Sequence, residues 1–241
     1  RLAEAQGAEK ILAVATSAIR AAKNGEDFLR RVGREIRIWP RAITGETEAR
    51  LIYLAALHSI HLEGQRALVV DIGGGSVELA LGAGSHLHWA VSEKLGVLRM
   101  SQRFVRSDPL SRGAGQRLAD HVGETVAPHV DRIADEGGFD RVIGTSGTIL
   151  ALGAMAHRME TGDVAPVLHH VTVRADTLHE LRQRLVAASL RERLKMPGVD
   201  ARRADLLVAG SVILDTILER LGAKSVVLCE WALREGLLLD Y

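Results

Sequence analysis

The chain has 241 residues, with 31 basic and 30 acidic side chains and a formal net charge of +1. This balance argues against a general nucleic-acid coat and against a membrane-surface protein. There is no apolar run of about 18 residues and no signal-peptide pattern, which predicts a soluble protein with no membrane partner. The single cysteine, Cys229, excludes an internal disulfide framework and fits a cytoplasmic protein.

The first predicted elements form a strand-turn-helix unit. Ile11–Val14 has the pattern of a short buried strand, and residues 15–24 turn from it into a helix with Thr16 or Ser17 as N-cap. A helix that begins at the carboxyl end of a strand can bind an anion. Arg20 lies on this helix, and its position alone favours a solvated helix residue over a residue that contacts the anion.

A charged helix is predicted over Asp27–Arg34, followed by a short strand over Ile36–Trp39 that Pro40 ends. The next helix runs from Thr44 or Gly45 to about residue 62, with Glu48 in its first turn. An acid there can simply complement the helix dipole, or it can act in catalysis. The spacing does not choose between these two roles.

The most informative stretch is a glycine hairpin. The apolar run Ala67–Val70 predicts a buried strand, Asp71 ends the run, and Gly73, Gly74, Gly75 and Ser76 form a turn. A second strand with period-two alternation follows and carries Glu78. Bare amides in such a turn suit phosphate oxygens, and the two carboxylates suit Mg²⁺. An ordinary glycine hairpin with incidental acids is the alternative.

A second strand, glycine-hydroxyl loop and helix start follows later in the chain. The strand over residues 141–143 leads into Gly144, Thr145, Ser146 and Gly147, and then into a helix to about residue 158. Amides and the dipole at the helix start would make a second anion cradle. The other predicted elements are strands at 86–95, 171–173 and 225–228 and helices at 96–106, 111–136, 177–190, 202–221 and 231–239. The ten histidines show no metal-binding spacing.

These motifs resemble the exopolyphosphatase and guanosine pentaphosphate phosphohydrolase family, within the superfamily of actin, the sugar kinases and the heat-shock ATPase chaperones. The resemblance rests on Asp-Ile-Gly-Gly-Gly-Ser-Val-Glu-Leu, on Ala-Thr-Ser-Ala-x-Arg-x-Ala-x-Asn, and on the glutamate directly before Ala-x-Leu. Gly-Thr-Ser-Gly-Thr and Arg-Ala-Asp-Leu-Leu also match. The motifs spread over most of the chain.

The resemblance implies an actin-like, ribonuclease H-like α/β fold of two domains with mixed sheets flanked by helices. Residues 1–51 would be the remainder of a first domain and residues 52–241 a second domain, with the active site between them. Members of the family begin with a further Asp-x-Gly-Ser-Asn-Ser hairpin, so the chain is expected to be a short form with an incomplete first domain. A sheet edge bared at the Ile11–Val14 strand would favour association, and a homodimer is compatible with that.

The resemblance also implies a hydrolase that releases terminal phosphate from inorganic polyphosphate or the 5′ γ-phosphate of guanosine pentaphosphate. In it, Glu48 would orient the attacking water and Arg20 would face the phosphates. Asp71 and Glu78 would hold Mg²⁺, and the two glycine cradles would bind phosphate. Arg203 would line the cleft, although a surface ion pair explains it equally well.

Two other functions remain open from the sequence. One is a phosphotransferase of the same superfamily that passes phosphate to a small acceptor. The other is a non-catalytic sensor that binds guanosine tetraphosphate or polyphosphate. The presence of Glu48 favours hydrolysis, since a sensor has no need of a general base.

Overall fold

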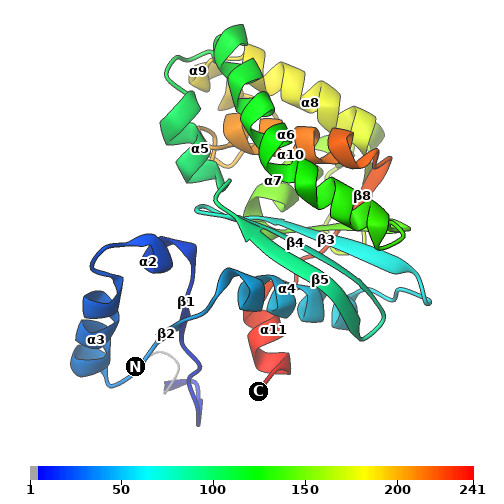
Figure 1. Ribbon diagram of the computed structural model, residues 1–241. Coiled ribbons are helices and arrows are strands. Elements are labelled where there is room, and N and C mark those ends of the chain that lie inside the picture. The colour runs from blue at the N-terminus through cyan, green and yellow to red at the C-terminus, as the bar shows by residue number, and fades with distance from the viewer. Residues whose placement is uncertain (1–4) are drawn as a thin grey trace.

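The computed structural model describes residues 5–241, and its main element is a six-stranded mixed β-sheet (Figure 1). The strand order is β5-β4-β3-β6-β8-β7. The central strands β3, β6 and β8 are parallel, while β4, β5 and β7 add to them in antiparallel fashion. The strands are β3 (Arg66–Ile72), β4 (Val77–Ala83), β5 (His86–Glu93), β6 (Arg141–Thr145), β7 (Thr172–Arg174) and β8 (Ser225–Leu228).

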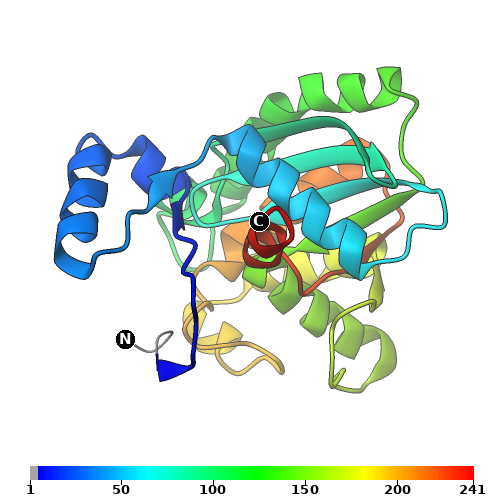
Figure 2. The same ribbon diagram turned by 90° about the horizontal axis from the view of Figure 1, so that it is seen from below.

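Helices cover both faces of this sheet, so the predicted α/β class with a mixed sheet flanked by helices is confirmed (Figures 1 and 2). One face carries α4 (Gly45–Ser59) and α11 (Leu233–Leu239). The helices on the side of the other face are α5 (Val97–Phe104), α6 (Arg112–Asp135), α7 (Ser146–Thr161), α8 (Ala175–Ala187), α9 (Leu190–Arg193) and α10 (Leu207–Leu221).

The central strand β3 is buried on both faces. Leu68 and Val70 point to the larger core, which lies under α6, α7 and α10, whereas Ala67 and Val69 point to the smaller core under α4. Successive side chains of a strand alternate between the two faces of the sheet, and both faces here are covered. The strand therefore has a continuous apolar sequence, as predicted.

A smaller N-terminal unit stands beside the sheet (Figure 1). It contains β1 (Val14–Ala15), α2 (Ser17–Ala21), α3 (Gly25–Ile36) and β2 (Arg41–Ala42), and β1 pairs with β2 in parallel. The predicted strand at Ile36–Trp39 is wrong. The helix α3 continues to Ile36 and ends at a left-handed Arg37, and the Trp39 ring then folds back against Gly33. The chain becomes extended only after Pro40.

Helix α4 connects the N-terminal unit to the sheet. The Thr44 side chain caps it by accepting from the amide of Thr47 at 3.1 Å. The boundary predicted after Leu51 falls inside this helix, and the first four residues of the predicted segment 1–51 lie outside the described residues. Within residues 5–241, none of the helices has the length and apolar character needed to cross a membrane.

Candidate active site

The glycine hairpin brings two carboxylates together at the carboxyl end of β3. The antiparallel register of β3 and β4 places Asp71 directly opposite Glu78, so both side chains lie on the same face of the sheet. That face is the one covered by α4, because Asp71 alternates with Val70 and Ile72, which point to the other core. Both carboxylates are buried. The predicted pairing of acids at this hairpin is confirmed.

Glu48 enters the same region from the first turn of α4. It is 7% exposed, and its Oε2 accepts a hydrogen bond from Nη1 of Arg20 at 3.0 Å. The same Nη1 donates to the carbonyl of Ile43 at 2.8 Å, which fixes the guanidinium just before α4 begins. The short helix α2 supplies Arg20, so the ion pair links the N-terminal unit to the helix that carries Glu48.

The pKa of each of these three acids is raised, and burial is the main cause in each case. Burial raises the pKa of Glu48 above its ordinary value, while hydrogen bonds from Arg20 and Thr16 lower it in part. Burial, then the charges of Glu78 and Glu48, raise the pKa of Asp71 well above its ordinary range. Burial and the charge of Glu48 also raise the pKa of Glu78 to about 7. A cation placed among these groups would relieve this repulsion.

The carbonyl groups of the glycine turn accept hydrogen bonds from the start of α5. Its residues donate to them in sequence: Val97 N–H to Gly73 O at 3.0 Å, Leu98 N–H to Gly74 O at 2.9 Å and Arg99 Nε to Gly75 O at 3.3 Å. In the part of the chain that the structure describes, the amides of Gly74 and Gly75 have no acceptor. The turn therefore leaves donors free, as a phosphate cradle requires.

Close contacts explain why the turn needs glycine at Gly75. None of the three glycines has a positive φ, so backbone conformation does not demand glycine here. A Cβ on Gly75 would lie 2.7 Å from the Oγ of Ser17, at the start of α2. From the other side Gly96 approaches so closely that its own Cβ would lie 2.4 Å from the backbone of Gly74 and Gly75. The turn is thus clamped between the N-terminal unit and α5.

The second predicted cradle lies beside the first, because β6 pairs with β3 and places Thr145 next to Asp71. Gly144 and Thr145 belong to β6 and are buried, and the Thr145 hydroxyl donates to the carbonyl of Trp231 at 2.8 Å. These two residues build the strand beneath the site. Ser146 and Gly147, which begin α7, are partly exposed at its surface.

Ser146 and Gly147 have features suited to a ligand-binding helix start. Ser146 has φ +87°, a strained value for a residue with a side chain, and its hydroxyl donates to the carbonyl of Ile72 at 3.0 Å. The guanidinium of Arg203 lies against Gly147, where a Cβ would come within 2.2 Å of Nη1. This position brings Arg203 to the first amides of α7, so the structure favours the cleft-lining role over a surface ion pair.

A cavity of about 300 Å³ lies between the N-terminal unit and the hairpin, and its walls include residues that the sequence did not indicate. Ser17, Arg20 and Ser76 line it, together with Ser92 and Lys94. The Oγ of Ser92 donates to Oε1 of Glu78 at 2.6 Å, because the register of β4 and β5 pairs these residues. A β-bulge between Leu81 and Gly82 shifts this register by one residue, so counting back from the turn would have placed Val91 opposite Glu78. No sequence pattern around Lys94 indicates that it lines this cavity.

The hairpin acids fit Mg²⁺ in their chemistry, since carboxylate oxygens are the ligands this ion prefers. Across residues 5–241, no three His, Cys, Asp or Glu side chains form a ready-made metal site. Mg²⁺ held by Asp71 and Glu78 would therefore take its other ligands from phosphate oxygens and water, as this ion commonly does.

Comparisons with known proteins show relatives of this chain in both sequence and fold. The sequence matches the Ppx/GppA phosphatase family over residues 1–241. Exopolyphosphatase 1 of Mycobacterium tuberculosis is 33% identical over 242 residues, covering 99% of this chain and 69% of the relative. The crystal structure of the Aquifex aeolicus member of the Ppx/GppA family gives a TM-score of 0.84 at 29% identity, over 99% of this chain and 76% of that one. An exopolyphosphatase structure from Cytophaga hutchinsonii gives 0.90 at 27% identity, over 99% and 77%.

Proposed function

Because this chain belongs to the Ppx/GppA phosphatase family, we propose that it hydrolyses the terminal phosphoric anhydride bond of inorganic polyphosphate. One observation carries the proposal: the buried carboxylate of Glu48 lies beside a glycine turn with free amides and two further acids. A water that reacts with a terminal phosphoryl group needs a base on one side and donors for phosphate oxygens on the other.

Glu48 is the group that orients the water and accepts its proton. Burial raises the pKa of Glu48 and makes it a better proton acceptor than an exposed carboxylate. Arg20 keeps the carboxylate in place through the 3.0 Å ion pair and supplies positive charge at the rim of the cavity. In this arrangement Arg20 positions Glu48 and also attracts the substrate.

Two sets of hydrogen-bond donors bind the phosphate chain, one in the glycine turn and one at the start of α7. Amides of Gly74 and Gly75 hold the terminal phosphate, and the start of α7 with Arg203 holds the phosphates behind it. Asp71 and Glu78 would hold Mg²⁺, which supplies positive charge to phosphate oxygens in the transition state. Ser92 fixes the rotamer of Glu78 by donating to Oε1.

The decisive experiment measures released phosphate with a malachite-green assay on long-chain polyphosphate and on guanosine pentaphosphate, with and without Mg²⁺. We expect release from polyphosphate that depends on Mg²⁺. Preferential release of phosphate from guanosine pentaphosphate would identify the nucleotide, and not polyphosphate, as the substrate. Binding of either compound without release would identify a sensor, and release that requires a small acceptor would identify a phosphotransferase.

A further inference from the structure

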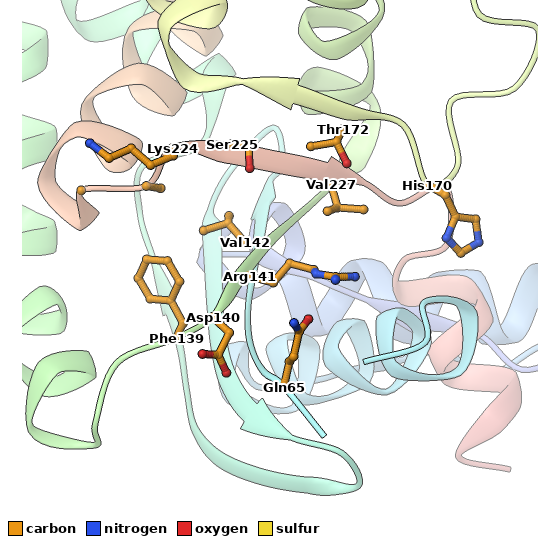
Figure 3. A pocket seen from close by; sticks show the side chains of 12 residues that line it. Gln65, Phe139, Asp140, Arg141, Val142, His170, Thr172, Lys224, Ser225 and Val227 are labelled. Carbon is orange, nitrogen blue, oxygen red and sulfur yellow. The ribbon is translucent and has the colours of Figure 1, made fainter. Parts of the chain in front are cut away.

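A larger cavity, of about 540 Å³, lies at the opposite edge of the sheet from the active site (Figure 3). It forms because β6 and β8 pair only through Ile143 with Val227 and Gly144 with Leu228. The beginnings of the two strands are therefore unpaired with each other, and the space between them is open. The active site lies at the carboxyl ends of the same strands, so the two sites are separate.

The cavity is lined by basic groups without acidic partners. Arg141 and Lys224 both line it, and no ion pair within residues 5–241 involves either side chain. The one acid in the lining, Asp140, accepts the amide of Arg66 at 2.8 Å through Oδ2. In Figure 3 the Arg141 guanidinium extends into the pocket on the side of His170. An anion would be attracted here.

Two features indicate a specific ligand. The Oε1 of Gln65 is buried and has no hydrogen-bond partner, and its amide points toward Arg141 in Figure 3. A buried acceptor without a donor is costly and uncommon. His170 has φ +69°, a left-handed conformation that side-chain-bearing residues seldom adopt. A strained residue and an unpaired acceptor in one basic cavity are typical of a binding site.

We propose that this cavity binds orthophosphate in its protonated form, hydrogen phosphate. Arg141 would donate to the phosphate oxygens, together with the hydroxyls of Thr172 and Ser225, and the phosphate O–H would donate to Oε1 of Gln65. A sulfate ion has the same shape and charge class but carries no proton at neutral pH. A site of this composition therefore distinguishes phosphate from sulfate.

The position of the cavity connects it to the catalytic cleft through one strand. Arg141 begins β6, and the same strand ends at Thr145, directly before Ser146 and the start of α7. Ser146 is bonded to the carbonyl of Ile72 beside the glycine turn. The binding proposal itself does not depend on which substrate the cleft hydrolyses.

Calorimetric titration of the purified protein with orthophosphate, sulfate and glycerol phosphate at constant ionic strength tests the proposal. We expect Arg141→Met to weaken orthophosphate binding by about tenfold or more, because a charged hydrogen-bond donor is lost. Arg191→Met, an exposed arginine outside the cavity, is the matched control and should bind like the wild type. Arg20→Met alters the cleft and should leave this binding in place.

Gln65→Met tests the origin of the selectivity, since it removes the acceptor and keeps the approximate shape. We expect the preference for phosphate over sulfate to fall about fivefold, with sulfate affinity unchanged. Lys224→Met is a second charge variant at the cavity, for use if Arg141→Met does not fold. Glycerol phosphate is mostly unprotonated at neutral pH, so it should bind more weakly than orthophosphate, as sulfate should. Equal affinity for phosphate and sulfate in the wild type, or phosphate binding lost only with Arg20→Met, would overturn the proposal.

Discussion

At the scale of single residues, the site depends on three carboxylates whose surroundings differ. Glu48 has a cation partner, Arg20, whereas Glu78 accepts from the hydroxyl of Ser92 and Asp71 is buried beside both of the other acids. The ion pair keeps Glu48 more easily ionised than its burial alone would allow. This difference supports the proposed roles of Glu48 as the proton acceptor and of Asp71 and Glu78 as cation ligands.

Glu48→Gln should lower turnover of polyphosphate by about 10² to 10⁴, because the amide cannot accept the proton of the attacking water. Substrate affinity should change little, since the amide keeps the shape of the side chain. The matched control is Glu46→Gln, which changes an exposed acid in the same helical turn. Steady-state kinetics measure both variants, and near-normal turnover in Glu48→Gln would remove this residue from the mechanism.

The raised pKa of Glu78 predicts a dependence of stability on pH in protein treated with a chelator. Between its ordinary value of 4.5 and the folded value of about 7, the folded state keeps a proton that the unfolded chain releases. The free energy of unfolding therefore falls as pH rises through this window, by an amount on the order of 3 kcal/mol. Glu78→Gln should remove this contribution.

Urea unfolding of the wild type and of Glu78→Gln at about pH 5 and about pH 8 measures the effect. The variant should lose less stability than the wild type over this interval. Added Mg²⁺ should restore wild-type stability at the higher pH and have little effect on the variant. Parallel pH profiles for the two proteins would show that Glu78 titrates normally.

At the scale of elements, the glycine turn is a junction between three segments. The first turn of α5 holds its carbonyls, α2 presses on Gly75 through Ser17, and β3 and β4 position the acids on either side. A shift in any one of these elements moves the free amides relative to Glu48. Positioning is a large part of phosphoryl-transfer catalysis, so small displacements here are costly.

Gly75→Ala should reduce kcat/KM about tenfold or more, because the new methyl group would lie 2.7 Å from the Oγ of Ser17 and must displace α2 or the turn. Gly73→Ala is the control, since its Cβ would meet nothing closer than 3.4 Å. The double variant Gly75→Ala with Ser17→Gly should recover much of the loss. Failure of the double variant to recover would mean that Gly75 is needed for another reason.

At the scale of the whole molecule, a nearly neutral chain concentrates positive charge where anions would bind. The net charge is +1, yet Arg20, Lys94 and Arg203 lie around the cleft. A polyphosphate chain would contact several such groups at once, whereas a nucleotide would also rely on its base. Local charge, and not the net charge, decides what the protein attracts.

The Michaelis constant for long polyphosphate should therefore rise steeply with salt, since each cationic contact releases counterions, by analogy with other polyanions. The constant for guanosine pentaphosphate should rise less. Replacing Lys94 with methionine should flatten the salt dependence for polyphosphate, and Lys195→Met, an exposed lysine away from the cleft, should not. Identical salt slopes for the two substrates would argue against multiple phosphate contacts.

The sequence by itself determined the local features of the site. The apolar run, the glycines and the period-two strand define the β3–β4 hairpin, and a four-residue turn between them places Asp71 opposite Glu78. These features depend on neighbours along the chain, so periodicity and turn chemistry suffice to predict them. The motifs around Glu48 and Arg20 are likewise short runs of neighbouring residues, so the sequence alone sufficed to indicate the family.

Only the tertiary structure decided which groups meet. It brought Arg20 to Glu48 and Ser17 to Gly75, and it showed that Thr145 is enclosed while Arg203 reaches Gly147. It also replaced the predicted strand over Ile36–Trp39. Helix α3 extends to Ile36 instead, and Trp39 folds back to pack on Gly33. Such contacts join residues far apart in the chain through the packing of whole elements, and no local pattern carries that information.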